Sequence, residues 1–356
     1  MSLLGTILLQ KWKKNLNVRD FNTMRVEKNT VIYVGCPAFN KTGGTELAHQ
    51  LVKTLLENGK NAYILYYDTN KIGDNSLINP AFTKYVSEYV TLNQVDDKEE
   101  NILVVPEIRI ELLSNFNKLQ KAIWWMSVDN YLKNNGFMNA VKFYGFLRAA
   151  KLLLTNKIAL FERNLNNQTL HLYQSEYARL FLESKGVTNV ARLSDYLNDT
   201  YLNTSEVSIK ERKDNVLYNP KKGIVFTQKL IKAAPQFNWI PIQNMTTDEV
   251  RELLLTSKVY VDFGNHPGKD RFPREAAISG CCIITDKKGS AKNSVDICIP
   301  ESYKFEDVSS NIELVTLKIK DCLDFFEKNI QSFDSYRESI LSEKKVFEND
   351  VKTLFG

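Results

Sequence analysis

The sequence lacks the cysteine pattern of a disulfide scaffold or of a structural zinc site. Its five cysteines stand at positions 36, 281, 282, 298 and 322. This odd number and irregular spacing fit neither paired disulfides nor a redox motif. Thiols stay reduced in a reducing compartment, so we expect the cysteines to be free and the protein to be cytoplasmic.

An export signal and a long hydrophobic run are also missing. The apolar run at residues 3–9 is too short to span a bilayer, and lysines follow it rather than precede it. We expect this run to form a helix that lies on the protein or on a membrane surface. A peripheral contact with the inner face of the membrane is therefore one alternative for a cytoplasmic protein.

Charge of one sign is not in strong excess. The chain has 47 lysines and arginines against 42 aspartates and glutamates, a net charge of +5, and the two signs are interspersed. Proteins that bind nucleic acids concentrate basic residues on one face. We therefore expect no nucleic-acid partner, although attraction to anionic phosphates stays open.

Three familiar ligand motifs are absent from the sequence. There is no Asp-x-Asp pair, no Gly-x-Gly-x-x-Gly fingerprint and no phosphate-cradling loop that ends in Gly-Lys-Ser/Thr. The missing dinucleotide fingerprint argues against a dehydrogenase. Because the Asp-x-Asp pair that would hold a divalent cation is missing, we expect neither a metal ion nor a cofactor.

What the sequence does contain is an alternation of strands and helices, in two rounds. A length of 356 residues is sufficient for two domains of ordinary size. In the first round, a helix is predicted over residues 45–56. The predicted strands of this round are residues 31–35, 62–67, 102–105, 122–126, 152–155 and 171–174.

The alternation restarts near residue 214. This second round has predicted strands at 215–218, 239–241, 258–263 and 281–285, predicted helices at 223–233, 247–257 and 274–279, and a helical C-terminal segment from 311. Strands that alternate with helices predict α/β domains built on parallel sheets. The polar segment 198–214 separates an N-terminal domain, 1–200, from a C-terminal domain, 201–325. Open parallel sheets bind ligands at the carboxyl ends of their strands, so we expect the active site between the domains.

A glycine turn follows the first predicted strand. Gly43, Gly44 and Thr45 open the helix that comes next. Glycines let the backbone approach a ligand closely, and the helix start presents unpaired N–H groups. This turn either is purely structural or touches the acceptor or the donor phosphates.

Two lysines occupy the corresponding turn of the second round. Lys221 and Lys222 precede the helix that begins at Gly223. There they would meet an anion drawn to the helix N-terminus, although taken alone they also fit a solvated turn. We interpret them as donor-binding residues because of the segment described next.

The segment 262–290 is the strongest candidate for a binding site. A strand leads into a loop rich in glycine, proline and hydrogen-bond donors, and a short helix follows. Arg271 can make bidentate contacts with a diphosphate, and Glu275 can accept bonds from ribose hydroxyls. Surface ion pairs are the alternative interpretation. The residues that we assign to donor binding here are Gly268, Arg271, Arg274 and Glu275, and those that we assign to catalysis are His266 and Lys269.

The acceptor side is less distinct. Trp124 and Trp125 end a predicted strand and are followed by Asp129. Aromatic rings stack on sugars, and Asp129 could orient a hydroxyl or act as a base. Burial of both tryptophans in the core is the alternative, and at most one of two adjacent strand residues would face the cleft.

Together these landmarks resemble a known family. Gly43-Gly44-Thr45-Glu46 is similar to the Gly-Gly-Thr/Ala-Glu loop of retaining glycosyltransferases with the GT-B fold, of the group 1 or family 4-like kind. The segment 273–281, with the Ile-Ile-Thr-Asp that follows it, resembles their Pro-x-x-x-Glu-Ala-x-Ala-x-Gly signature. The stretch 175–196 resembles the end of their first domain. The version here is similar to transferases encoded among capsule and surface-polysaccharide enzymes.

The resemblance implies two Rossmann-like domains and a C-terminal helix, 326–356, that crosses back to the first domain. It implies transfer of a hexose-like sugar from a nucleotide-diphosphate donor to a glycan or lipid-linked acceptor, with retention of configuration. Pro267 replaces the family's sugar-holding glutamate, so that role would pass to His266, Lys269 or Asp270. An inverting route would need a base, for which Asp129 is the first candidate. The alternative is a non-catalytic sugar- or nucleotide-binding partner in a polysaccharide assembly system.

Overall fold

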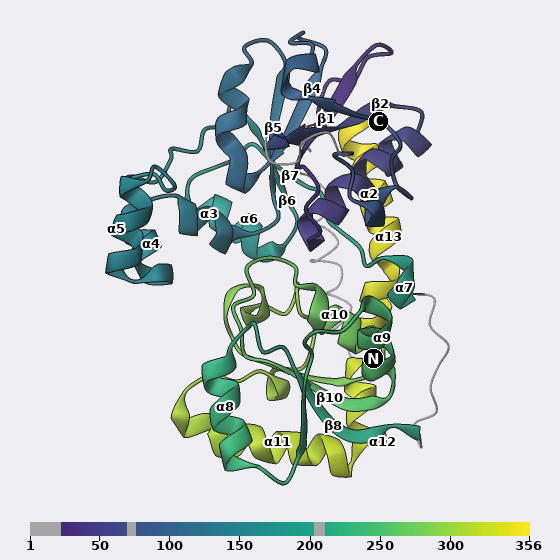
Figure 1. The fold of residues 1–356 in the computed structure, drawn as a ribbon. Coiled ribbons are helices and arrows are strands. Elements are labelled where there is room, and N and C mark those ends of the chain that lie inside the picture. The colour runs from purple at the N-terminus through teal and green to yellow at the C-terminus, as the bar shows by residue number, and fades with distance from the viewer. Residues whose placement is uncertain (1–22, 70–75, 203–210) are drawn as a thin grey trace, which may run out of the picture.

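The structure is a computed structural model that describes residues 23–69, 76–202 and 211–356 (Figure 1). The apolar run at residues 3–9 lies outside these described residues. Across the described ranges, none of the helices combines the length and apolarity that a membrane crossing requires.

The first sheet has seven parallel strands in the order β3-β2-β1-β4-β5-β6-β7. Buried apolar side chains cover both of its faces, as expected for parallel strands that helices sandwich. Strand β1 pairs in parallel with β2 on one side and with β4 on the other. The direction in which successive strands are added to the sheet reverses between β1 and β4. The strands are β1 (Val31–Pro37), β2 (Asn61–Tyr67), β3 (Tyr89–Thr91), β4 (Ile102–Pro106), β5 (Gln120–Trp125), β6 (Leu170–Tyr173) and β7 (Val190–Arg192).

The helices of this half include one that contradicts the sequence interpretation. Residues 152–155, predicted as a strand, fall at the end of helix α5 and just beyond it, and Leu154 is 85% exposed. A short apolar run does not distinguish a strand from a helix, because both use leucine. The α-helices are α2 (Gly43–Glu57), α3 (Val128–Asn134), α4 (Phe137–Tyr144), α5 (Phe146–Leu154), α6 (Glu176–Ser184) and α7 (Asp199–Leu202).

The second sheet has four parallel strands in the order β11-β10-β8-β9, so its order reverses between β8 and β10. Its strands are β8 (Lys213–Tyr218), β9 (Asn238–Pro241), β10 (Ser257–Asp262) and β11 (Cys282–Thr285). The helices that follow are α8 (Ile224–Ala233), α9 (Thr247–Leu255), α10 (Arg271–Ile278), α11 (Ile312–Asp324), α12 (Phe326–Ile330) and α13 (Asp334–Phe355).

Helix α13 connects the two halves (yellow in Figure 1). Tyr336 and Ile340, near its start, pack in the core of the second sheet. Phe347 and Leu354, near its end, pack in the core of the first sheet. The two sheets are therefore tied together by one continuous helix, and the carboxyl ends of β1, β4, β5, β8 and β10 lead into loops that face each other.

Candidate functional site

A cavity of about 560 Å³ lies between the two halves, at the switch points of both sheets. From the first half it is lined by the loops after β1, β4 and β5, and from the second by the loops after β8 and β10. The charged and amide side chains that line it are Asn40, Glu107, Asn130, Gln174, Asp195, Lys222, Lys269, Asp270, Arg271 and Glu275. Parallel sheets thus bring together residues that are far apart in sequence.

The glycine turn lines this cavity at the start of α2. Thr42 caps the helix by accepting a hydrogen bond from the backbone N–H of Thr45, whose hydroxyl donates to the carbonyl of Thr42. A Cβ atom on Gly43 would lie 3.3 Å from Nε of Arg271, and one on Gly44 would lie 3.5 Å from the sulfur of Met126. The predicted loop residues therefore border the cavity, and the hydroxyl of Thr45 serves the helix cap.

Glu46, the next residue of α2, forms an ion pair that joins the two halves. Its Oε2 lies 2.5 Å from a terminal nitrogen of Arg271, and Oε1 accepts a 2.7 Å hydrogen bond from the hydroxyl of Tyr85. Burial disfavours the carboxylate, but the Arg271 guanidinium outweighs burial and holds the pKa of Glu46 below its usual value. The sequence interpretation placed Glu46 only within the family resemblance.

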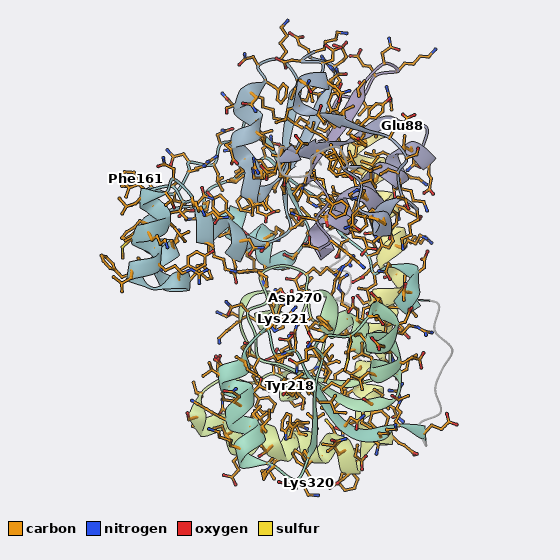
Figure 2. The ribbon with its side chains drawn as sticks, viewed as in Figure 1. Glu88, Phe161, Tyr218, Lys221, Asp270 and Lys320 are labelled. Atoms are coloured by element: carbon orange, nitrogen blue, oxygen red, sulfur yellow. The ribbon has the colours of Figure 1, made fainter. Side chains whose placement is uncertain are left out.

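The predicted lysines differ in their placement. Lys222 lines the cavity with its ammonium 2.7 Å from Asp270, and Lys269 lines it with its ammonium 2.8 Å from Glu343 of α13. Lys221, which Figure 2 labels, is exposed and lies outside the lining. The structure therefore brings Lys222 and Lys269 into the cavity and leaves Lys221 on the surface.

The loop at Pro267 and Gly268 touches the opposite domain directly. The backbone N–H of Val128 donates to the carbonyl of Pro267 at 2.9 Å. A Cβ atom on Gly268 would lie 1.9 Å from the carbonyl oxygen of Met126, so a larger residue would push the loops apart. Gly268 thus lets the two sides of the cavity close on each other.

Arg274, predicted to bind the donor, lies outside the cavity lining. Its side chain is 0% exposed, and its guanidinium lies 2.6 Å from Asp195 and 2.7 Å from Glu343. These partners belong to the end of the first half and to α13. We therefore assign Arg274 to the connection between the halves, because a buried guanidinium with two carboxylate partners has no free face for a diphosphate.

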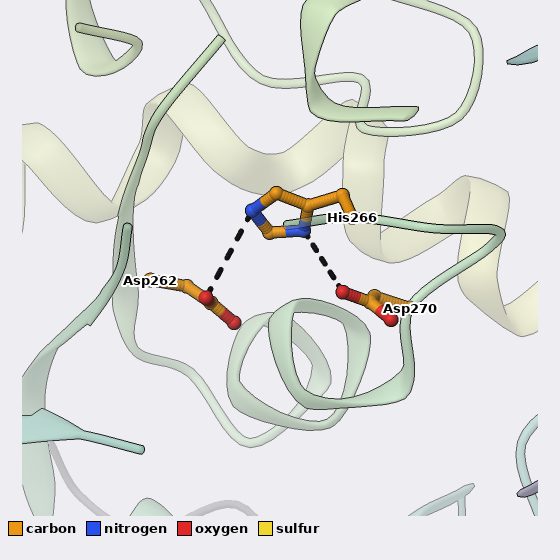
Figure 3. A group of neighbouring side chains, drawn as sticks. All are labelled: Asp262, His266 and Asp270. Atoms are coloured by element: carbon orange, nitrogen blue, oxygen red, sulfur yellow. Dashed lines mark ion pairs between the residues drawn. The ribbon is translucent and has the colours of Figure 1, made fainter. Parts of the chain in front are cut away.

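His266, predicted to be catalytic, lies outside the cavity lining, between Asp262 and Asp270 (Figure 3). Its ring is 0% exposed, with Nδ1 3.0 Å from Asp270 and Nε2 3.8 Å from Asp262 and 3.4 Å from Asp286. Burial would lower the pKa of His266, but the three carboxylates raise it to about 9. His266 therefore supports Asp270, which lines the cavity, and has no access to a substrate.

This cluster also has the composition of a metal site. One ligand atom from each of Asp262, His266 and Asp270 can be chosen so that all lie within 4.8 Å of one another. Lys222 and His266, however, already supply positive charge to these carboxylates. We interpret the cluster as an ion-pair network that fixes Lys222 and Asp270 at the cavity.

Glu275, the predicted ribose ligand, lines the cavity from α10. Burial raises its pKa to about 7, although the neighbouring Arg271 and Arg274 partly oppose this rise. The glutamate is thus poised between its charged and neutral forms near neutral pH. Either form can hydrogen-bond a hydroxyl group.

The sequence interpretation missed Glu107. This residue follows β4 directly, lines the cavity and is 3% exposed. Burial raises its pKa to about 8, while the backbone N–H of Met126, 3.1 Å from Oε2, favours the charged form. A carboxylate directly after a buried strand was the signal available in the sequence, since that is the position where parallel sheets bind ligands.

Asp129 and the tryptophan pair do not line the cavity. Asp129 is 7% exposed and accepts a 3.0 Å hydrogen bond from the hydroxyl of Tyr177. Trp124 and Trp125 are both buried in the sheet core, as in the alternative interpretation. Ser127 and Asn130, beside Asp129 on the same turn, line the cavity instead. The predicted segment therefore borders the cavity, but through residues other than those predicted.

The comparisons with known proteins identify the fold. No protein-family model matches the sequence, and no curated protein matches it. Among solved structures, HepE of Anabaena, in complex with UDP and glucose, has a TM-score of 0.58 at 12% identity, with 92% of this chain and 99% of HepE covered. A glycosyltransferase of Rickettsia africae has a TM-score of 0.54 at 12% identity, with 92% of this chain and 94% of that chain covered.

A third similar structure is TarM of S. aureus, in complex with fondaparinux, alpha-GlcNAc-glycerol and UDP. It has a TM-score of 0.51 at 14% identity, with 74% of this chain and 57% of TarM covered. Together with the two parallel sheets, these likenesses show that the chain has the GT-B fold, as the sequence predicted. At these sequence identities the structural similarity establishes the fold but not the function.

Proposed function

We propose that the chain is a glycosyltransferase that moves a sugar from a nucleotide-diphosphate donor to a glycan or lipid-linked acceptor. One observation carries this proposal. Three cationic side chains of the C-terminal half, Lys222, Lys269 and Arg271, line the same cavity as Glu107 of the N-terminal half. This arrangement suits a reaction in which a leaving diphosphate and an acceptor hydroxyl approach from opposite sides.

The donor is proposed to bind on the C-terminal side of the cavity. Arg271 and Lys269 neutralise the diphosphate, Lys222 acts beside them, and Glu275 accepts hydrogen bonds from the ribose. HepE and TarM are each described in complex with UDP, so UDP-sugars are the first donors to test. A hexose is the first sugar to test, on the basis of the family resemblance.

The leaving group is proposed to be stabilised by side chains, without a metal ion or cofactor. The lysines and the arginine line the cavity and supply positive charge where the negative charge of the leaving diphosphate develops. The lack of an Asp-x-Asp pair supports this proposal, since that pair would hold the divalent cation.

The acceptor is proposed to bind on the N-terminal side. Ser127 and Asn130 can hydrogen-bond sugar hydroxyls, and Glu107 in its carboxylate form accepts the hydrogen bond of the reacting hydroxyl. Retention of configuration follows from the family resemblance. In an inverting reaction Glu107 would replace Asp129 as the base, because Glu107 lines the cavity. We place the reaction in the cytoplasm, in the synthesis of bacterial surface polysaccharide.

The test is release of nucleoside diphosphate from a panel of UDP-, GDP-, TDP- and ADP-sugars, and of CMP from CMP-sugars, with simple sugar acceptors and without them. We expect one donor to be turned over by the wild type and at least about 100-fold more slowly by Arg271→Ala, because Arg271 provides charge-assisted hydrogen bonds. Arg251→Ala, on a surface helix, is the control. Binding of a donor without turnover under any acceptor would favour the non-catalytic partner instead.

A further inference from the structure

The N-terminal half carries a helical hairpin that stands away from its main body (Figure 1). Helices α4 and α5 pack against each other and bury only a small core of their own, made of Ala140, Ala149 and Ile158. Large apolar side chains on the outside of the hairpin are not part of this core.

Large apolar side chains are nevertheless exposed on this hairpin and on the segment that follows it. Leu147 and Leu154 are each 85% exposed, Phe161 is 79% exposed and Met138 is 69% exposed. Phe161 lies at the outer end of this part of the molecule in Figure 2. Large exposed apolar side chains gathered on one short segment of the chain are typical of an interaction surface.

The hairpin is also basic. Residues 130–161 include five lysines and arginines and no aspartate or glutamate. The chain as a whole has a net charge of +5, so this segment accounts for all of it, and the remaining residues are balanced. The five cationic residues are Lys133, Lys142, Arg148, Lys151 and Lys157.

Cationic and apolar side chains alternate on one face of α5. Leu147, Lys151 and Leu154 are spaced four and three residues apart, so they lie on the same side of the helix, and all three are exposed. The centres of protein–protein interfaces are depleted of charge, especially of lysine. Lysines interleaved with leucines are instead typical of a membrane-binding surface. There the lysine side chains reach the lipid headgroups, and the leucine side chains enter the acyl region.

The hairpin is connected to the proposed active site. Helix α3, whose Asn130 lines the central cavity, leads into α4. A second groove of about 470 Å³ shares Glu107 with the central cavity and extends to Asn134 and Lys157 at the base of the hairpin. The groove at the base of the hairpin and the central cavity therefore adjoin at Glu107.

We propose that the α4–α5 hairpin docks the protein on an anionic lipid surface, and that the acceptor is a lipid-linked sugar that enters by the groove from Lys157 to Glu107. The docking stands on the hairpin alone, while the assignment of the acceptor rests on the proposed function. Each lysine near an anionic surface strengthens binding about fivefold, and the exposed leucines and Phe161 add to this by insertion.

The experiment is co-sedimentation of the full chain with vesicles of phosphatidylglycerol mixed with phosphatidylcholine, and with vesicles of phosphatidylcholine alone, without a sugar donor. The wild type is expected to bind the anionic vesicles and to be released by salt. The triple variant Lys142→Ala/Arg148→Ala/Lys151→Ala, whose three cations lie outside the groove, is expected to bind about 100-fold more weakly. The variant Leu147→Ser/Leu154→Ser/Phe161→Ser is expected to lose binding by a similar factor.

Matched controls come from the C-terminal half. Leu314→Ser/Leu317→Ser removes exposed leucines from α11, and Lys232→Ala/Lys320→Ala/Lys328→Ala removes three exposed lysines. Both controls should bind vesicles as the wild type does. Equal binding by the hairpin variants, or no binding by the wild type, would overturn the proposal. A concentration-dependent dimer that only the apolar hairpin variant abolishes would also overturn it, because a second copy would then cover the face.

The two proposals fail separately. Nucleotide release with a soluble acceptor tests the central cavity and should be unchanged in the hairpin variants. Vesicle binding without turnover of any donor would leave the docking surface in place and remove the assignment of a lipid-linked acceptor. Turnover stimulated by acceptors in vesicles, and lost in the hairpin variants, is the result expected if both proposals hold.

Discussion

Glu46 and Arg271 form an ion pair between the two halves, with 2.5 Å between the carboxylate oxygen and the guanidinium nitrogen. The two residues come from helices of different sheets, α2 and α10. Because Arg271 is the proposed ligand of the donor diphosphate, we expect the donor to displace the Glu46 carboxylate from the guanidinium, which would exchange one anion for another.

Glu46→Gln should therefore tighten binding of the nucleoside diphosphate. Removal of the competing charge frees Arg271, and we expect the dissociation constant to fall about threefold to tenfold, as for the net contribution of about 1 kcal/mol from an ordinary hydrogen bond. Calorimetric titration measures this change. Glu57→Gln, at the exposed end of the same helix, is the control. Weaker binding by Glu46→Gln would show that Glu46 assists the donor rather than competing with it.

The activity should depend on the ionisation of Glu107. Its pKa is raised to about 8, and the carboxylate form is the one that accepts a hydrogen bond from the acceptor hydroxyl. We expect kcat/KM to rise with pH and to level off above about 8. Glu107→Gln should lower kcat/KM by at least about 100-fold and remove this step. Glu111→Gln, exposed on the same segment, should retain it.

The pH dependence of the free energy of unfolding is a second test of Glu107. Its folded pKa lies above the usual value, so the folded protein loses stability as the pH rises from about 4.3 to about 8, by about 1.4 kcal/mol per pH unit at most. Glu107→Gln removes this loss and should be more stable relative to the wild type at pH 8 than at pH 5. An unchanged difference across this range would contradict the burial of an ionisable group there.

Arg274 should matter for stability rather than for the donor. Arg274→Met leaves Asp195 and Glu343 buried without their arginine, which costs about 3–5 kcal/mol in comparable pairs. We expect a lower urea midpoint with little change in donor affinity at permissive temperature. Arg251→Met, at a surface pair, should change stability by less than about 0.5 kcal/mol. Full stability with lost donor binding would place Arg274 at the donor after all.

The His266 cluster should respond to pH and not to chelation. The pKa of His266 is raised to about 9, so its ion pairs contribute stability that is complete below about 6.5 and lost as the pH rises through about 9. His266→Asn should remove this dependence. EDTA should leave the melting temperature of the wild type unchanged. A loss of stability in EDTA that zinc or manganese restores would instead make Asp262, His266 and Asp270 metal ligands.

The fold was predictable because its signals are repeated along the chain. The alternation of buried strands with helices appears in both halves, and each glycine-containing turn after a strand marks a helix start. The predicted GT-B fold is confirmed. The strand predicted at 152–155 is wrong because its leucines belong to an amphipathic helix with an unburied face. Strands β3 and β7 were missed because each has only three residues.

The segments that form the site could be predicted from the sequence, but the individual residues that line the cavity could not. The sequence indicates which loops follow which strands, but side-chain direction depends on packing. Arg271 and Arg274 are three residues apart on one short helix, yet Arg271 lines the cavity and Arg274 is buried toward α13. Asp129 and Glu107 show the same difficulty, since both are buried but only Glu107 lines the cavity, and the partners that orient them come from distant segments.

We propose that the cavity between the domains binds a nucleotide-sugar donor through Arg271 without a metal ion. A thermal-shift panel of UDP-, GDP-, TDP-, ADP- and CMP-sugars in EDTA, on the wild type and on Arg271→Ala, tests this donor site. We expect one nucleotide to raise the melting temperature of the wild type and to leave that of the variant unchanged. A wild type that no nucleotide stabilises, with EDTA or with added divalent cations, would rule out a donor site at Arg271.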